Sequence, residues 1–292
     1  MSAIASAASP CPTTTLRVFR KTSGSILCPS CGRLTNADAR ECLVCGRRNP
    51  GMWGFAGPLR SLFRRRQFID VVSVACVVFY VITLLLDPAG ALRARGLFDI
   101  LPTSQAAQLA AGATGAFPWR AGAWWTLLTA IYLHGNLIHL VFNVISIRVL
   151  GPPVEEICGP ARTMVIFTVA GVVGFALSNW FGYALTLGAS GAVFGLLGGM
   201  VAYGQKRGGA FGSMLLRQWG MLALLLFMQG FWMNSVNNVA HAGGFLGGYA
   251  AALVLALPEH KGESGTDQLL AAACIVLTLL GFVLAFWTAF AS

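Results

Sequence analysis

The sequence predicts an all-α, polytopic membrane protein with a small cysteine-rich domain before its first membrane span. Of the 292 residues, 56% are hydrophobic and only 10% are charged. A soluble domain carries roughly 25% charged residues. The apolar residues also gather in runs long enough to cross a bilayer as helices. Together these observations exclude an ordinary water-soluble globular protein.

Positive charge is concentrated near the N-terminus. The formal net charge is +10, and eleven Lys and Arg residues against two acidic ones fall within residues 1–67. The run RSLFRRR directly precedes the first apolar segment. Positive charge at that place favours the cytoplasmic face of a membrane and contact with anionic lipid. We therefore expect a cytoplasmic N-terminus and no nucleic-acid partner.

Four cysteines in the segment CPSCGRLTNADARECLVCG predict a metal site. Cys28 and Cys31 form one Cys-x-x-Cys-Gly knuckle, and Cys42 and Cys45 form a second one. Four thiolates at this spacing suit a tetrahedral Zn²⁺. Two disulfides would require an oxidising compartment, against which the basic flank argues. Because no coordination position stays open, we expect a structural ion and a docking or regulatory domain with a cytoplasmic protein partner.

The chain is expected to have four parts. A flexible N-terminus, 1–25, precedes a zinc-ribbon-like cytoplasmic domain, 26–50. A basic linker, 51–67, then leads to the transmembrane domain, 68–292.

Seven apolar segments of that last part are expected to be membrane helices. They cover residues 68–86, 132–150, 164–181, 190–203, 219–233, 239–257 and 269–290. With a cytoplasmic N-terminus, a loop near 205–217 lies inside, and its basic residues agree with the positive-inside rule. The long first outer loop, 88–131, is rich in tryptophan and is expected to lie in the membrane interface.

The fourth segment, 190–203, is expected to be a short central helix. Its fourteen residues would extend only about 21 Å, against ~30 Å of hydrocarbon. A helix that short must be wrapped by others and begin at the floor of a wet cavity. Gly191 and Gly195 would let another helix approach closely. The sixth segment offers a matching strip that includes Gly244 and Gly248.

Ser190 and His241 form the candidate catalytic pair. His241 shares a helix face with Gly244 and Gly248, so contact between the two glycine strips would bring its imidazole to Ser190. A serine needs an adjacent base to accept its proton as it attacks, and histidine titrates in a suitable range. The neighbouring spans carry no carboxylate that could orient the ring. We therefore expect a dyad in which the ring of Phe194 steadies His241.

The stretch HGNLIHLVFN supplies candidate donors for an oxyanion. His139 and Asn143 are four residues apart and share one helix face. Acyl transfer places negative charge on the former carbonyl oxygen, and fixed hydrogen-bond donors stabilise that charge. The backbone N–H groups of Ala189 and Ser190, at the free start of a helix, would add to them. Gly188 permits the tight turn into this helix.

The motifs HGNLIHLVFN, GASGAVFG and AHAGGFLGG, in this order on the second, fourth and sixth segments, resemble the rhomboid family of intramembrane serine proteases. The resemblance implies a six-helix bundle with one added C-terminal helix (6+1). It implies Ser190 as nucleophile and His241 as base. It also implies His139, Asn143 and the Ser190 backbone around the oxyanion, with His134 at the loop end of the first motif.

The same resemblance implies substrates that are single-span membrane proteins, cut near the outer end of their helix without a metal or cofactor. The active site would open to the outer side of the membrane, most simply a bacterial plasma membrane. Two alternatives stay open. One is a catalytically silent relative that binds membrane clients, although this chain keeps both Ser190 and His241. The other is a small transporter, but no inverted repeat or paired charge supports it.

Overall fold

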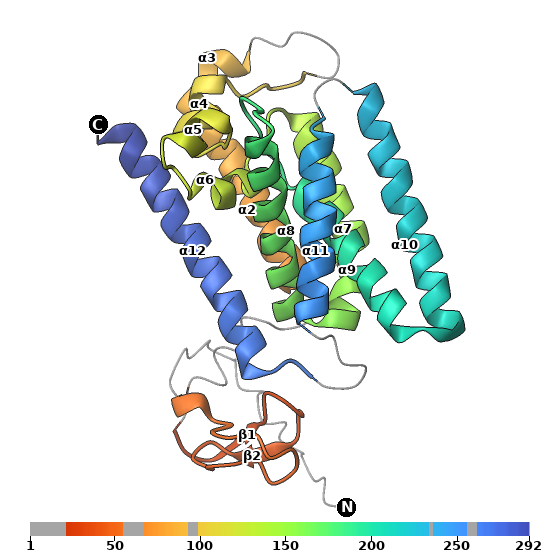
Figure 1. Cartoon of the computed structure of the whole chain (residues 1–292). Coiled ribbons are helices and arrows are strands. Elements are labelled where there is room, and N and C mark those ends of the chain that lie inside the picture. The colour runs from red at the N-terminus through yellow and green to blue at the C-terminus, as the bar shows by residue number, and fades with distance from the viewer. Residues whose placement is uncertain (1–21, 55–66, 93–98, 234–235, 256–261, 292) are drawn as a thin grey trace, which may run out of the picture.

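The computed structural model describes residues 22–54, 67–92, 99–233, 236–255 and 262–291. Most of the expected flexible N-terminus, 1–25, and of the expected basic linker, 51–67, lies outside these ranges. Within them, residues 22–54 form a small unit, here called the four-cysteine domain, at one end of a helical bundle (Figure 1). The predicted fold class, a polytopic helical bundle preceded by a ribbon-like segment, is confirmed.

The four-cysteine domain is a two-stranded ribbon with two knuckles. Strands β1 (Ser25–Leu27) and β2 (Leu34–Asn36) pair antiparallel, and a 3-10 helix (Met52–Gly54) follows. Each knuckle closes on a glycine with a left-handed backbone, Gly32 at φ 71° and Gly46 at φ 69°. The N–H of each glycine donates to the carbonyl of the first cysteine in its knuckle. A side chain would strain this turn, which explains the glycines.

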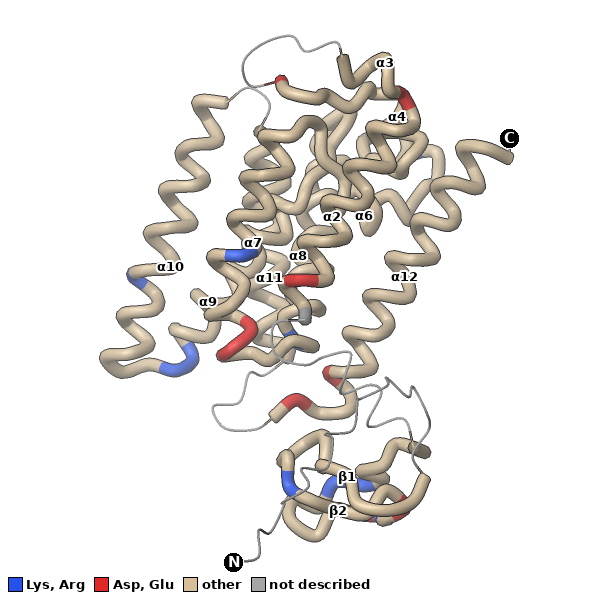
Figure 2. Tube along the Cα trace, turned by 180° about the vertical axis from the view of Figure 1, so that it is seen from behind, with Lys and Arg blue, Asp and Glu red and all other residues tan. Residues whose placement is uncertain are grey.

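Seven helices of 17 or more residues make up the described part of the bundle. They are α2 (Gln67–Leu86), α7 (Leu137–Cys158), α8 (Pro160–Trp180), α9 (Ser190–Arg207), α10 (Gly209–Gln229), α11 (Asn238–Val254) and α12 (Gly265–Phe290). Figures 1 and 2 show α8, α9 and α11 in the middle, with α10 and α12 on opposite flanks. The seventh helix is thus added to one side of the other six.

Five of the described helices are long and apolar enough to cross a membrane. These spans are Phe68–Leu86, Leu137–Cys158, Pro160–Trp180, Gly209–Trp232 and Gly265–Phe290. The other two long helices, α9 and α11, are glycine-rich and bury many of their residues inside the bundle. A helix enclosed by other helices does not need a fully apolar surface, because little of it would face lipid.

Helices α9 and α11 touch backbone to backbone through glycines. A Cβ added to Gly244 would lie 2.0 Å from the carbonyl oxygen of Gly191, and one added to Gly248 would lie 2.1 Å from that of Gly195. Gly191 in turn faces the carbonyl oxygen of Ala240, where a Cβ would lie at 3.2 Å. Small residues at four-residue spacing permit this approach. The two glycine strips therefore meet as the sequence predicts.

The expected length of the fourth helix is wrong. Helix α9 continues to Arg207, so its 18 residues extend about 27 Å rather than about 21 Å. Lys206 and Arg207 in the last turn are favourable at the carbonyl end of a helix. The helix stops at Gly208, which has φ 61°. The loop expected near 205–217 is in fact the end of α9 and the first part of α10.

The second span is also displaced from its expected bounds of 132–150. Asn136 caps the helix by accepting the N–H of His139, so α7 begins at Leu137. The helix then passes through Pro152 and Pro153 and ends at Cys158. Local signals therefore place the start of this helix better than the apolar run does, because a cap satisfies the first free N–H groups.

The first outer loop folds into short helices over the end of the bundle remote from the four-cysteine domain (Figure 1). They are α3 (Pro88–Ala91), α4 (Gln105–Ala110), α5 (Ala116–Arg120) and α6 (Thr126–Thr129). Phe117 and Trp124 on this loop are exposed, as expected for a segment in the membrane interface. The loop is tied to the bundle where Thr114 pairs with Thr186 by two backbone hydrogen bonds.

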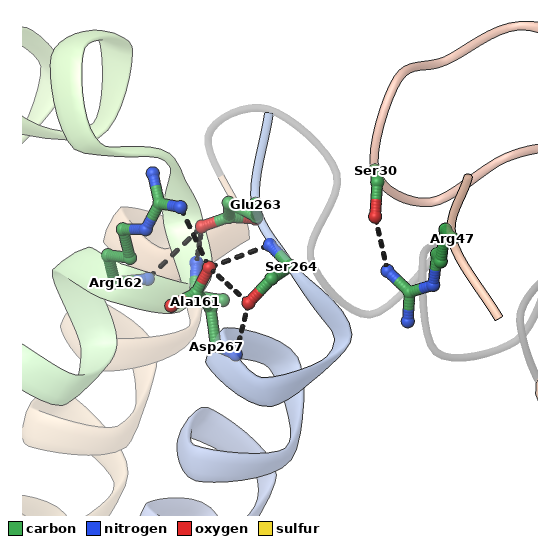
Figure 3. Close-up of polar contacts among 7 residues, drawn as sticks. All are labelled: Ser30, Arg47, Ala161, Arg162, Glu263, Ser264 and Asp267. Atoms are coloured by element: carbon green, nitrogen blue, oxygen red, sulfur yellow. Dashed lines mark hydrogen bonds and ion pairs between the residues drawn. The ribbon is translucent and has the colours of Figure 1, made fainter. Parts of the chain in front are cut away.

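A buried ion pair joins α8 to α12 at the end of the bundle near the four-cysteine domain (Figure 3). Arg162 Nη2 lies 2.8 Å from Asp267 Oδ2, and both side chains are more than nine-tenths buried. Asp267 also accepts the N–H and the hydroxyl of Ser264, which forms a capping box at the start of α12. The apolar pattern of the sequence did not reveal this pair, because it placed Asp267 before the start of the last span.

Glu263 caps the start of α8 beside this ion pair, in a region here called the α8–α12 corner. Its Oε1 accepts the backbone N–H groups of Ala161, at 2.5 Å, and Arg162, at 3.1 Å (Figure 3). The four-cysteine domain touches this corner, because the guanidinium of Arg47 lies against Gly265, where a Cβ would collide with it. Burial raises the pKa of Glu263 from 4.5 to about 7, although the two N–H groups act in the opposite direction.

Replacing Gly248 by Ala should destabilise the bundle. The new methyl carbon would meet a backbone carbonyl that cannot rotate away, so we expect a loss of about 1–3 kcal/mol. Thermal unfolding in detergent micelles measures it. Gly220 of α10 is the matched control, because a Cβ there would meet nothing within 4 Å. Gly220→Ala should be neutral or stabilising. Equal losses for the two variants would contradict a close backbone contact at Gly248.

Glu263 should make the stability of the protein depend on pH. Its pKa is higher in the folded protein than in the unfolded chain, so the folded state binds this proton more tightly. The stability that it contributes is therefore present below about pH 4.5 and lost as pH rises to about 7. Unfolding temperatures of wild type and Glu263→Gln, compared between pH 5 and 7.5, test this. If the unfolding temperature changed with pH to the same extent in Glu263→Gln as in the wild type, Glu263 would not be the source of the pH dependence.

Candidate active site

Ser190 is the first residue of α9 and follows a tight turn. Gly188 has φ 119°, and its N–H donates to the carbonyl oxygen of Ala130 at 2.9 Å. A Cβ at Gly188 would lie 2.7 Å from the imidazole of His139, so only glycine fits there. Ala189 is the N-cap residue and no side chain caps this helix in the described structure. The first N–H groups of α9 are therefore available to a ligand.

His241 lies in the first turns of α11, and its ring faces Ser190. The Nε2 atom is 2.8 Å from Ser190 Oγ, within hydrogen-bond distance. The Nδ1 atom has no hydrogen-bond partner among the described residues. The ring of Phe194 stacks on the imidazole with 4.3 Å between ring centroids and 17° between planes. The serine hydroxyl, the imidazole and the phenyl ring thus form one compact group between α9 and α11.

His139 and His134 lie beside this group. The N–H of Gly135 donates to His139 Nδ1 at 3.4 Å, so in the neutral ring the proton is assigned to Nε2. That nitrogen is the one next to Gly188. His134 is fully buried and meets the ring of His139 edge-on, at 5.1 Å between centroids. The two histidines therefore bring an N–H donor next to the turn that precedes the serine.

Asn143 lies one helical turn further along α7 and is buried. Its Nδ2 donates to the carbonyl oxygen of His139 at 2.9 Å. One hydrogen of the amide is used in this way, and the second is the donor that a ligand would use.

Sequence reasoning missed a polar group beside the site. Asn237, the N-cap residue of α11, donates to the hydroxyls of Ser178 and Thr186, which belong to α8 and to the loop before α9. The sequence did contain a signal for the cap, because asparagine is a favoured N-cap residue and Asn237 lies just before the predicted helix. The identity of its partners was not readable from the sequence, because they are distant along the chain.

The four cysteine sulfurs of the four-cysteine domain converge on one point. All lie within 4.8 Å of one another, with 3.7 Å between Cys28 and Cys45 and 3.8 Å between Cys31 and Cys42. A tetrahedral zinc site with Zn–S bonds of about 2.3 Å has sulfurs about 3.8 Å apart. The cluster therefore fits a thiolate-bound metal ion.

Comparison with known proteins finds similarity to the rhomboid family. A family model described as the rhomboid domain matches residues 121–258. Rhomboid protease GluP of Bacillus subtilis is 35% identical over 168 residues, which are 56% of this chain and 32% of that protein. RHOMBOID-like protein 5 of Arabidopsis thaliana is 31% identical, over 48% of this chain and 47% of that protein.

A further bacterial relative, the putative rhomboid protease YdcA of Bacillus subtilis, is 33% identical over 44% of this chain and 65% of its own length. The chain thus spans less than two thirds of each of these relatives. The residues matched by the family model include both Ser190 and His241 and the stretch from His134 to Asn143. Residues 121–258, which hold the candidate site, therefore resemble the rhomboid domain.

Proposed function

We propose that this protein is an intramembrane serine endopeptidase that cleaves transmembrane segments of single-span membrane proteins. The observation that carries the proposal is the 2.8 Å separation of Ser190 Oγ and His241 Nε2 at the start of α9. Relatives named as rhomboid proteases support a protease of this family. The reaction uses a Ser–His dyad and no metal or cofactor.

In the first step Ser190 Oγ attacks the scissile carbonyl carbon, and His241 Nε2 takes the hydroxyl proton. Phe194 holds the imidazole by stacking on its face, whereas in a catalytic triad a carboxylate orients the ring through a hydrogen bond to Nδ1. The protonated His241 then gives its proton to the leaving amine. A water molecule, deprotonated by His241, then attacks the acyl carbon; the bond to Ser190 Oγ breaks, and His241 returns the proton to Oγ.

The oxyanion that forms in each step is bound by donors from two helices. The N-terminal backbone N–H groups of α9, at Ala189 and Ser190, supply one side, and His139 Nε2–H with the free amide hydrogen of Asn143 supplies the other. His134 packs against His139 and limits its movement. Where a single donor of this kind has been removed from a serine protease, the barrier rose by about 3–4 kcal/mol.

The protein is proposed to sit in a bacterial plasma membrane with its four-cysteine domain in the cytoplasm and its active site open to the outer side. In Figure 2 most of the described charged residues lie in the four-cysteine domain and in the half of the bundle nearer to it. Lys206, Arg207 and Arg217 are at this end, which agrees with the positive-inside rule. The four cysteines hold a structural Zn²⁺, and the domain binds a cytoplasmic protein partner rather than nucleic acid.

Replacing Ser190 by Ala should abolish cleavage. Purified wild type and variant are reconstituted in liposomes with a fluorogenic transmembrane peptide, and a fluorophosphonate probe is mapped by mass spectrometry. We expect cleavage and labelling at Ser190 by the wild type alone. Ser146→Ala removes a partly exposed serine of α7 and should behave as wild type. Wild-type protein that neither cleaves nor labels would favour the silent, client-binding alternative.

Removing zinc should unfold the four-cysteine domain alone. A cluster of thiolates around a metal contributes its binding energy to folding, so a chelator should expose the backbone amides of residues 26–50 to hydrogen exchange. Cleavage of the transmembrane peptide should stay within about twofold, because no sulfur ligand lies in the catalytic group. Immediate loss of cleavage on chelation would show that the domain takes part in core activity.

A further inference from the structure

The start of α11 is fixed by Asn237. Its Oδ1 accepts the N–H of Ala240 at 3.0 Å, and its carbonyl oxygen accepts the N–H of His241 at 3.2 Å. The side chain therefore caps the helix that carries the candidate base, in the manner typical of asparagine. His241 is only one helical turn away, so any tilt or shift at this end of α11 moves its imidazole.

The other end of the Asn237 side chain reaches out of its own helix. Its Nδ2 donates to Ser178 Oγ at 2.5 Å and to Thr186 Oγ1 at 3.1 Å. These two hydroxyls are 3.0 Å apart and both residues are buried. The two amide hydrogens thus join α11 to the last turn of α8 and to the loop that leads into α9.

Thr186 is itself held firmly, four residues before the candidate nucleophile. Its backbone N–H donates to the carbonyl of Thr114 at 2.7 Å and its carbonyl accepts the N–H of Thr114 at 3.2 Å. Two residues later, the Gly188 N–H is bound by Ala130. The chain from Thr186 to Ser190 therefore has few ways to move. Asn237 fixes the position of α11 relative to this segment.

The bridge adds to the glycine contact between α9 and α11. Gly191, Gly244 and Gly248 let the two backbones touch, but a glycine has no side chain with which to hold a neighbouring helix in register. The bonds of Asn237 add a directional constraint at the end of α11 nearest to Ser190.

We propose that Asn237 is a positioning residue for the Ser190–His241 dyad, acting as the bridge that sets α11 in register with the loop before α9. The inference rests on the proposed protease function. It is specific to the bridge, that is, to the bonds with Ser178 and Thr186, and not to the N-cap alone. Misplacement of a catalytic group by about 1 Å can reduce the rate by about a hundredfold.

Three variants separate the bridge from the cap. Asn237→Ser keeps a capping oxygen but has no atoms to reach both hydroxyls, so kcat should fall about 10- to 100-fold with KM within about twofold. Asn237→Asp keeps the cap, and its second oxygen can accept from both hydroxyls, which rotate freely. Its kcat should therefore exceed that of Asn237→Ser, although a buried carboxylate is less favourable there than the neutral amide. Asn237→Ala loses cap and bridge and should be the least active.

Ser264→Ala is the matched control for loss of a cap. It removes the N-cap side chain of α12, at the other end of the bundle, and should lower the unfolding temperature while leaving kcat unchanged. Thr186→Val removes the far end of the bridge. The double variant Asn237→Ser/Thr186→Val should lose no more kcat than the more damaged single variant, because both changes break the same bond.

The readouts are kcat and KM for the transmembrane peptide, the rate of fluorophosphonate labelling at Ser190, and the unfolding temperature of each variant. The positioning role would be overturned if Asn237→Ser had the kcat of the wild type. It would also be overturned if the losses of kcat in the two single variants added up in the double variant. The protease assignment would stand in both cases. Failure of the wild type to cleave and to label would overturn both proposals.

Discussion

The direct backbone contact between α9 and α11 is the constraint on which the rest of the bundle depends. The candidate nucleophile and base come from two different helices, and a 2.8 Å contact between their side chains requires the two helices to lie close together. Gly244 and Gly248 make this possible, because a Cβ at either would meet a carbonyl oxygen of α9. Neither α9 nor α11 is among the five described helices that are long and apolar enough to cross a membrane, so the more apolar helices around them must supply the lipid-facing surface.

Polar groups inside a membrane find little water, so they need hydrogen-bond partners within the protein. At the end of the bundle remote from the four-cysteine domain, neutral amides and hydroxyls supply these partners. Asn136 caps α7, Asn237 caps α11 and joins two hydroxyls, and Thr129 donates to a loop carbonyl. The His241 ring is held by stacking on Phe194 rather than by a carboxylate. Uncharged groups suit this place because a buried charge without a partner costs far more than a satisfied hydrogen bond.

At the end of the bundle near the four-cysteine domain, charged side chains make the contacts between helices. The buried Arg162–Asp267 pair and the Glu263 cap join α8 to α12 there, and the four-cysteine domain touches the same corner through Arg47. A buried pair of this kind is weak support for overall stability, since desolvation offsets much of the attraction, but losing one partner is costly. These contacts therefore fix how the added seventh helix meets α8, while the candidate site is built from residues at a different depth of the bundle.

The sequence alone determined the helical class, the cysteine cluster and the grouping of Ser190, Phe194 and His241, because these follow from local composition, from fixed spacing and from three short motifs that resemble one family. Periodicity was enough to put His241 on the glycine face of its helix. It could not set helix ends, so α9 was expected four residues too short, and it could not identify the partners of Asn237, Asp267 or Glu263. Those partners are separated by about 50 to 100 residues along the chain. Only packing of the helices decides which distant loops and turns meet.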